Sequence, residues 1–453
     1  MGNQFYEQQL RFLAIGCLVA LVADRVLSAR KRRDTSNDAR DDRVEGGLNC
    51  FLLYPSHSRI AADWLQGPYV YSLYHDQYAF EEYWVAVLFV TGFLSGGLSA
   101  PLVGAWADST GRKRLCLVFC ATYTSACLCI LVPSLPVLLF GRVLGGISTS
   151  ILFSAFESWL ISSANSHALP QSDLSRIMGR ATLVNGIVAT GAGVLSNQLV
   201  SSSGSFASPF LASGALLVVA WFVIRAMWTE NFGSVSDETA ATDPFQLGRL
   251  RLATRIVSND LRLLVLGITQ TCFEGSMYLF VFMWVPALQE YSLMGQLPLG
   301  YIFSSFMISM MLGSLLYTYI AAASTESTLL THAKLSSIVC AVAAFALALA
   351  VSQHDDRARF YAFCLFEACV GMYYPVQGML RGALISNDQR ATLSALFRVP
   401  LNIFVVVSLL TGVGHAGARG AVLSACSVML AVASVLTGLF VVEKVDGSVA
   451  ARL

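Results

Sequence analysis

Long apolar runs separated by short polar breaks recur along this chain from Leu10 to Val442. The runs are about 18 to 25 residues long, which is the length of a helix that crosses a bilayer and roughly twice that of a membrane strand. Because a chain in lipid must satisfy its own backbone groups, the pattern predicts an all-α membrane protein. The expected helices span residues 9–28, 48–75, 83–107, 114–132, 135–160, 174–200, 207–228, 260–288, 297–322, 330–351, 358–383, 390–413 and 417–442.

The range 48–75 is the least regular of these helices. Pro55, Arg59 and Asp63 interrupt its apolar run. We keep a crossing there because the topology requires one, and because Trp64 and Tyr69 suit a membrane interface.

The composition agrees with a membrane protein. Hydrophobic residues make up 55% of the 453 residues and charged residues only 13%, whereas a globular protein carries about 25% charged residues. The formal net charge of +1 gives no reason to expect a nucleic-acid partner. The 11 cysteines and six histidines form no paired ligand spacing, and the sequence contains no hydrolase, metalloprotease or phosphate-loop motif. We therefore expect no enzyme activity, no catalytic residue, no bound metal and no cofactor.

Positive charge alternates between the polar breaks. A basic cluster at 30–33 follows the first apolar run, which indicates an anchor with an outward N-terminus rather than a cleaved signal peptide. The basic breaks then all fall on the cytoplasmic side, with Arg112, Lys113, Arg114, Arg176, Arg249, Arg251, Arg255, Arg262, Lys334, Arg381 and Arg390. The opposite breaks at 75–82, 132–136, 201–209 and 289–298 contain no lysine or arginine, although Arg357, Arg359 and Arg419 depart from the pattern. We expect a multi-pass plasma-membrane protein with a cytoplasmic C-terminus.

One break carries a recognisable motif, Gly104-Ala-Trp-Ala-Asp108-Ser-Thr-Gly111-Arg112-Lys113-Arg114. It resembles the G-x-x-x-D-x-x-G-R-K signature of the major facilitator superfamily. Glycines let two helices approach closely, an aspartate can cap or pair at a helix end, and the basic run faces anionic lipid. We expect this motif to govern gating between conformations without contacting substrate, and the alternative is an accidental basic loop. The gating positions are Gly104, Asp108, Gly111, Arg112 and Lys113.

The number of helices predicts two halves of six. Without the first helix, twelve remain, and the long polar break at 229–259 divides them equally. This organisation predicts the major facilitator fold, two six-helix bundles with pseudo-twofold symmetry, plus one extra N-terminal transmembrane helix. In such folds solute binds at mid-membrane between repeats. The expected parts are an anchor and basic cytoplasmic loop (1–46), the N-terminal bundle (47–228), a cytoplasmic linker (229–259), the C-terminal bundle (260–442) and a short cytoplasmic tail (443–453).

Arg142 lies in the stretch Gly141-Arg-Val-Leu-Gly-Gly-Ile-Ser, which is similar to the intramembrane arginine motif of the superfamily's fourth helix. A charge among apolar neighbours is costly in lipid, and is therefore a candidate for substrate binding. The alternative is that Arg142 braces a neighbouring helix or extends to the membrane surface. Gly186, Gly191 and Gly193 have no following proline, so the antiporter signature of the fifth helix is missing.

Other intramembrane charges recur with the repeat. The opening helix of each three-helix unit carries one acid, and the middle helices of the second and fourth units carry an arginine with an asparagine behind it. The acids are Asp63, Glu157, Glu274 and Glu367, and the other positions are Arg180, Asn185, Arg398 and Asn402. Two arginines converging from opposite halves would suit a tetrahedral dianion. The acids would balance charge or couple protons, with Glu274 the best candidate; alternatively, Glu157–Arg180 and Glu367–Arg398 are structural bridges.

Longer blocks resemble a narrower family, the eukaryotic molybdate-anion transporters. They are Ala61-Ala-Asp-Trp-Leu-Gln-Gly-Pro-Tyr-Val-Tyr, Leu152-Phe-Ser-Ala-Phe-Glu-Ser-Trp, Ile302-Phe-Ser-Ser-Phe-Met and Phe397-Arg-Val-Pro-Leu. The resemblance implies uptake of molybdate, a tetrahedral oxyanion, by a carrier in the lipid bilayer, and we expect a monomer. One alternative is transport of another small anion such as sulfate. The other is a transport-inactive solute sensor, although sensors usually carry long cytoplasmic extensions and this tail is short.

Overall fold

The computed structural model describes residues 2–33, 60–166, 171–231, 254–292, 296–324, 327–385, 387–412 and 416–442. These residues are helical apart from short connections and contain no strand, so the prediction of an all-α protein is confirmed. The surroundings of four positions singled out by the sequence, Gly104, Asp108, Glu157 and Arg180, fall outside this description.

The long helices follow the apolar runs. They are α1 (Gly2–Arg33), α4 (Glu82–Thr110), α5 (Arg112–Cys129), α6 (Leu135–Ser166), α7 (Gln171–Ser203), α8 (Ser208–Met227), α11 (Leu261–Gln289), α12 (Leu299–Ala323), α13 (Thr328–Ser352), α14 (Asp356–Leu384), α15 (Asn387–Gly412) and α16 (Ala416–Thr437). Eight helices among the described residues are long and apolar enough to cross a membrane. α14 is also long enough but carries more charge, and two of its charged residues, Arg359 and Glu367, are buried inside the protein. Burial of this kind hides charge from lipid.

The irregular range expected at 48–75 is a broken helix where the structure describes it. The residues before 60 lie outside the described part of the chain. Helical residues 60–66 lead into a 3₁₀ turn at Gly67–Tyr69, a short α3 (Val70–Ser72) and a π-helical turn at Leu73–Gln77. Pro68 sits in the 3₁₀ turn, where the missing N–H of proline prevents a regular helical hydrogen bond.

Two compact units make up the chain. The N-terminal unit contains residues 29–246 and 299–304, and the C-terminal unit contains residues 1–28, 247–298 and 305–453. The first six residues of α12 therefore group with the N-terminal unit, and residues 2–28 of α1 group with the C-terminal unit. The boundary at 246/247 falls within the segment 229–259 that the sequence marks as a linker.

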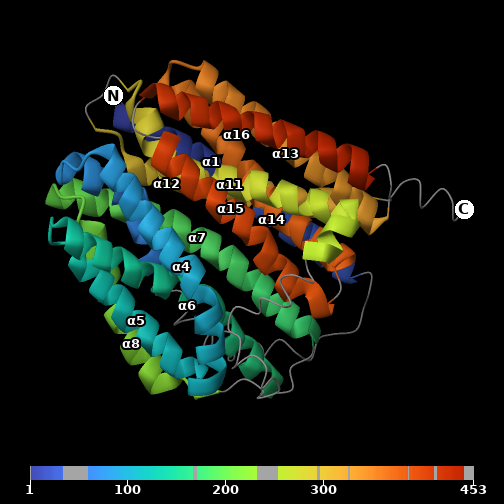
Figure 1. Cartoon of the computed structure of the whole chain (residues 1–453), viewed down its shortest axis with the longest axis horizontal. Coiled ribbons are helices and arrows are strands. Elements are labelled where there is room, and N and C mark those ends of the chain that lie inside the picture. The colour runs from blue at the N-terminus through green and yellow to red at the C-terminus, as the bar shows by residue number, and fades with distance from the viewer. Residues whose placement is uncertain are drawn as a thin grey trace, which may run out of the picture. The chain divides into compact units, whose positions relative to one another are not determined.

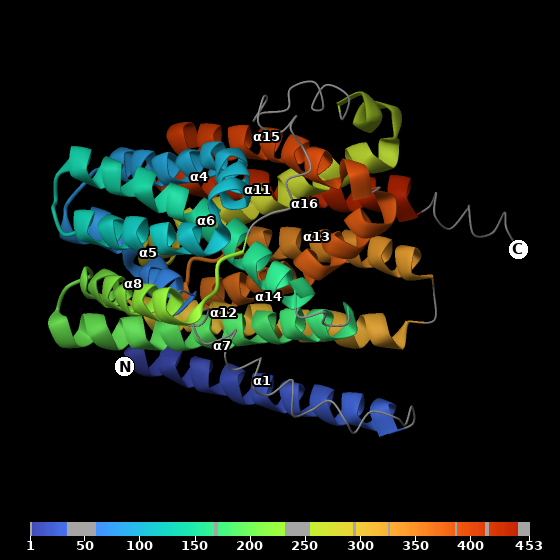
Figure 2. The ribbon, with the colours of Figure 1, turned by 90° about the horizontal axis from the view of Figure 1, so that it is seen from below.

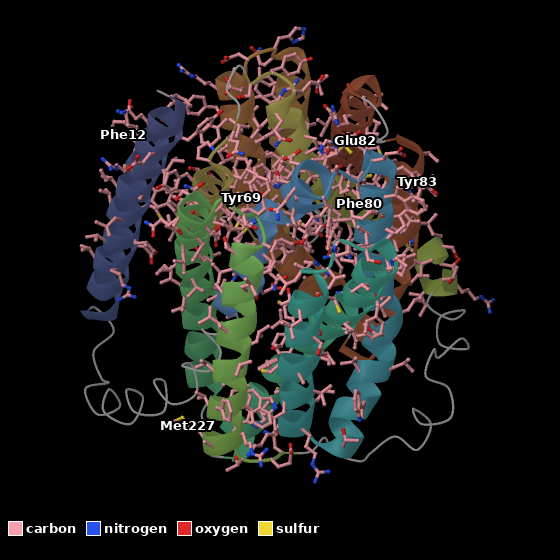
Figure 3. The ribbon with its side chains drawn as sticks, turned by 90° about the vertical axis from the view of Figure 1, so that its left-hand side faces the viewer. Phe12, Tyr69, Phe80, Glu82, Tyr83 and Met227 are labelled. Atoms are coloured by element: carbon pink, nitrogen blue, oxygen red, sulfur yellow. The ribbon has the colours of Figure 1, made fainter. Side chains whose placement is uncertain are left out.

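The N-terminal unit is a layered bundle in which α5 packs against α6 and α8, and α4 packs against α6. Figures 1 and 2 show these four helices side by side. Glu82 at the start of α4 and Met227 at the end of α8 lie at opposite ends of the unit (Figure 3). The shared core is built around Phe119 of α5 and Phe156 of α6, whose rings meet edge to face.

In the C-terminal unit, α11 packs against α14, α15 and α16, and α13 packs against α14 and α16 (Figure 2). Phenylalanine and tyrosine rings from α11, α12 and α14 fill its core, with Phe273 and Tyr373 stacked and Phe363 edge to face with Phe280 and Phe306. The crossing of α12 and α14 depends on two glycines. A Cβ at Gly313 would clash with the backbone of Ala368, and a Cβ at Gly371 would clash with the backbone of Met310. Small residues here let the two backbones touch, as is usual between membrane helices.

Two of the arginines that depart from the charge pattern have structural partners at the start of α14. Arg357 lies over the ring of Phe5 of α1, 4.7 Å from its centroid. Arg359 is 5% exposed, and its Nη1 donates to the carbonyl oxygen of Ala287 over 2.6 Å, while Glu290 lies 3.7 Å away. Both arginines therefore take part in packing between helices.

Candidate functional site

The gating motif of the sequence forms the turn between α4 and α5. Gly104 and Asp108 lie in α4, Gly111 separates the two helices, and Arg112 and Lys113 open α5. Gly111 has a φ of +101°, which L side chains rarely adopt. A Cβ at this position would also lie 2.6 Å from Cδ of Glu230. The backbone conformation therefore favours glycine, and a larger residue would also displace the Glu230 carboxylate.

Glu230, just beyond α8, caps the N-terminus of α5. Its Oε1 accepts a hydrogen bond from the backbone N–H of Lys113 over 2.7 Å, and its Oε2 accepts one from Arg114 over 3.2 Å. The first N–H groups of a helix have no partner within the helix, and a carboxylate is favourable beside them. The Lys113 ammonium also donates to the carbonyl oxygen of Arg225 in the last turn of α8 over 3.1 Å. Thus the end of α8 and the motif turn form one hydrogen-bonded cluster.

Two tryptophans anchor the same segment to α6. The rings of Trp159 and Trp228 stack with centroids 3.7 Å apart. Trp159 Nε1 donates to the carbonyl oxygen of Thr229, and Asn231 Nδ2 donates to the carbonyl oxygen of Trp159. We call residues 228–231 the α8 strap. Its residues 229–231 fall in the segment 229–259 that the sequence predicts to be a cytoplasmic linker, and the described structure shows them hydrogen-bonded to α5 and α6 of the bundle.

Arg142 of α6 braces α4. Its Nε donates to the carbonyl oxygen of Leu88 over 3.1 Å, and its guanidinium passes where a side chain at Gly92 would otherwise lie, with Nη2 2.8 Å from the ideal Cβ position. This contact agrees with the bracing alternative for Arg142.

Polar side chains of the broken helix are paired inside the N-terminal unit. Asp63 Oδ1 accepts a hydrogen bond from the hydroxyl of Tyr123 on α5 over 2.6 Å. Asn185 of α7 uses Oδ1 to accept from Trp64 Nε1 over 3.0 Å. The structure therefore places Asp63 and Asn185 within polar networks of one bundle, while the side chains of Arg180 and Glu157 lie outside the described residues.

Glu274 of α11 is the centre of a polar group in the C-terminal unit. Arg381 Nη2 lies 3.8 Å from Glu274 Oε1, with the two side chains 23% and 12% exposed, respectively. Gln270 Nε2, one turn earlier, donates to Glu274 Oε2 over 3.3 Å. Arg398 of α15 adds a further electrostatic attraction to the same carboxylate. Three helices thus bring two guanidinium groups toward one acid.

Glu367 and Arg398 do not form the bridge that the sequence analysis considered. Glu367 is 5% exposed, and no ion pair in the described part of the chain includes it. Arg398 is exposed, and Asn402, one turn further along α15, is half-buried. The acid to which Arg381 and Arg398 are attracted is Glu274.

Sequence reasoning missed Glu230, Gln270 and Arg381 as members of these clusters. Arg381 was expected only to mark a cytoplasmic helix end, and it does lie in the last turn of α14. Glu230 lies 117 positions along the chain from its partner Lys113. Arg381 lies 107 positions from its partner Glu274. One available signal was the run of three basic residues at the start of α5, because that end of a helix favours negative charge.

Comparison with known proteins gives the family. Residues 10–357 match the family model of sugar transporters with 12 transmembrane segments. A molybdate-anion transporter of Takifugu rubripes is 32% identical over 433 residues, covering 90% of this chain and 88% of the relative. Relatives with the same name are 35% identical in Xenopus tropicalis, covering 78% of this chain and 76% of the relative, and 33% identical in Danio rerio, covering 85% of each.

Solved structures agree on the fold. The nucleoside transporter NupG has a TM-score of 0.67 at 12% identity, covering 87% of this chain and 99% of that protein. A bacterial homologue of the human lysosomal transporter Spinster has a TM-score of 0.65 at 13% identity, covering 87% and 96%. A peptide transporter has a TM-score of 0.68 at 10% identity, covering 86% and 93%. The protein is a multi-pass membrane transporter and not an enzyme, and it belongs to the molybdate-anion transporter family of the major facilitator superfamily.

Proposed function

We propose that this protein imports molybdate across the plasma membrane by alternating access. The observation that carries the proposal is its 32% identity, over 90% of the chain, to a relative named molybdate-anion transporter. The chemistry of the C-terminal unit supports it, because guanidinium groups match the geometry and charge of an oxyanion. The proposed orientation has the N-terminus outside and the C-terminus in the cytoplasm, and the proposed state is a monomer in the bilayer.

The proposed substrate site combines charges from both halves. Arg398 and Asn402 would bind the oxyanion from the C-terminal half, and Arg180, Asn185 and Arg142 from the N-terminal half. The acids Asp63, Glu157, Glu274 and Glu367 would balance these charges or carry a coupled proton. The motif turn, with Asp108 and Gly111, would control the change between conformations without touching the anion.

Accumulation of radiolabelled molybdate in cells expressing the chain tests this proposal. We expect the wild type to accumulate molybdate from nanomolar solution in the presence of excess sulfate. Arg398→Gln should lower uptake on the order of tenfold or more, because a charge-assisted hydrogen bond contributes about 1.5–3 kcal/mol. Arg357→Gln is the matched control, since it removes an arginine of the same unit that lies over a phenylalanine ring.

Two outcomes would contradict the proposal. Normal uptake by a surface-resident Arg398→Gln variant would remove that arginine from the site. Absence of uptake by surface-resident wild type would remove molybdate as the substrate.

A further inference from the structure

Two arginine–glutamate pairs in the C-terminal unit differ in how tightly they are held. Arg359 donates to two backbone carbonyl oxygens, those of Ala287 and Gln353, in addition to facing Glu290. Arg381 faces Glu274 at 3.8 Å, and its one hydrogen bond in the described structure is from Nε to the carbonyl oxygen of Gln377 over 3.4 Å. A tight guanidinium–carboxylate bond measures about 2.7–2.9 Å. The Arg381–Glu274 contact is therefore loose.

Arg398 lies on α15, which packs against α11, the helix that carries Glu274. Its attraction to Glu274 acts together with that of Arg381, and its side chain is exposed. It makes no hydrogen bond among the described residues. Two guanidinium groups with unused donors, both attracted to one carboxylate, form an anion-binding arrangement that a planar carboxylate fills only in part.

We propose that Arg381 binds the transported oxyanion together with Arg398, and that the Glu274 carboxylate competes with the oxyanion for these two arginines. The inference rests on the proposed function, which it extends by one binding residue and one competitor. Glu274 stands where an oxygen of the substrate would otherwise accept from the guanidinium groups. Arrival of the oxyanion therefore displaces the carboxylate from Arg381.

Charge balance gives the consequence for protons. Two arginines and an ionised Glu274 carry a formal charge of +1, so a dianion brings the group to −1. If Glu274 takes a proton from water as the dianion binds, the group is neutral, and a net charge inside a membrane protein is costly. Binding of a dianion thus favours uptake of one proton on the Glu274 carboxylate, and release of the dianion favours loss of that proton.

The groups that face Glu274 come from three helices. They are Arg381, Tyr373 and Tyr374 from α14, Arg398 from α15, and Gln270 and Tyr278 from α11 itself. α16 also packs on α11 and carries no charged residue after Arg419. Glu274 is the one carboxylate among these groups, and the buried Glu367 of α14 also acts on Tyr374.

Binding of radiolabelled molybdate to the purified full chain in lipid nanodiscs tests the inference. The variants are Glu274→Gln, Arg381→Gln and the double variant, with Glu290→Gln as the control that removes the acid of the other pair. Glu274→Gln should bind molybdate several-fold more tightly and lose most of the pH dependence of binding. Arg381→Gln should weaken binding tenfold or more, and the weakening should persist in the double variant. Arg381→Lys should restore part of the affinity.

A purely structural bridge predicts a different pattern. If Arg381 serves only to hold Glu274, the double variant will bind as tightly as Glu274→Gln, and this result overturns the inference. Equal affinity of wild type and Glu274→Gln at every pH overturns the competition. If the wild type binds sulfate but not molybdate, the proposed substrate is wrong, and the same comparison on the sulfate isotherm decides the role of Arg381. A wild type that binds neither anion overturns both proposals.

Discussion

Replacing Glu230 with alanine would remove the cap that the α8 strap places on α5. The carboxylate accepts two backbone hydrogen bonds, from Lys113 and Arg114, at the start of a helix whose first three residues are all basic. Basic side chains are unfavourable at the positive end of the helix dipole. Without Glu230, the N–H groups of Lys113 and Arg114 would lose their carboxylate acceptor and bind water instead. No negative charge would then offset the repulsion between the basic side chains and the positive end of the helix dipole.

The expected cost follows from these contacts. Loss of a helix N-cap costs about 0.5–2 kcal/mol, and loss of a negative charge beside the dipole adds about 0.3–1 kcal/mol. Because Glu230 is half-buried, water can replace part of the hydrogen bonding that the substitution removes. We expect a total of about 1–3 kcal/mol, which corresponds to a fall in Tm on the order of 2–10 °C for a unit of this size.

Thermal unfolding of the purified protein in nanodiscs would measure this cost. Glu230→Gln is the matched variant, since it keeps one acceptor oxygen and loses the charge, and we expect about half the loss of Tm. Uptake measured on the same variants should show a changed maximal rate with an unchanged KM, because Glu230 contacts the motif turn and not the proposed anion site.

An unchanged Tm for Glu230→Ala would refute the capping argument, since two lost hydrogen bonds at a helix start cannot then contribute to stability. An equal loss of Tm for Glu230→Gln and Glu230→Ala would show that the charge of Glu230, and not its hydrogen bonds, stabilises the start of α5. A change confined to KM would contradict the separation of the motif turn from the substrate site.

Three further predictions concern other parts of the chain. Gly371→Ala should lower Tm, because overpacking at the Met310 backbone costs about 1–3 kcal/mol, whereas Gly378→Ala on the same helix, with open space around it, should not; equal effects would contradict the α12–α14 crossing. Burial raises the pKa of Asp260, but hydrogen bonds from Arg262 outweigh it and hold the pKa below its ordinary value. A lowered folded-state pKa stabilises above the unfolded value of about 3.9, so the Tm gap between wild type and Asp260→Ala should narrow as the pH falls below about 4, and a constant gap would refute this. Asp108→Asn should slow maximal uptake several-fold at unchanged KM, and a pure loss of affinity would argue against its gating role.

The positions of the helices could be read from the sequence because lipid imposes a local rule. In lipid, each backbone group must find its hydrogen-bond partner within its own segment. An apolar run such as Leu329–Ser352 therefore forms a helix, and this does not depend on distant residues. The place of the motif turn was equally accessible, because the polar stretch from Asp108 to Arg114 interrupts two apolar runs. The exact form of the broken helix at 60–77 was not accessible, because mixed helical turns depend on the packing of neighbouring helices.

The sequence by itself determined the all-α membrane architecture, the family and the candidate charges Glu274, Arg142 and Arg398. Only the tertiary structure decided which partners those charges have. Arg142 contacts a backbone carbonyl of α4, Glu274 faces Arg381, and Glu230 caps a helix more than a hundred residues away. Electrostatic pairing falls off with distance in space and is independent of distance along the chain. Apolar periodicity therefore fixes where the helices lie in the sequence, and their packing against one another selects the ion pairs.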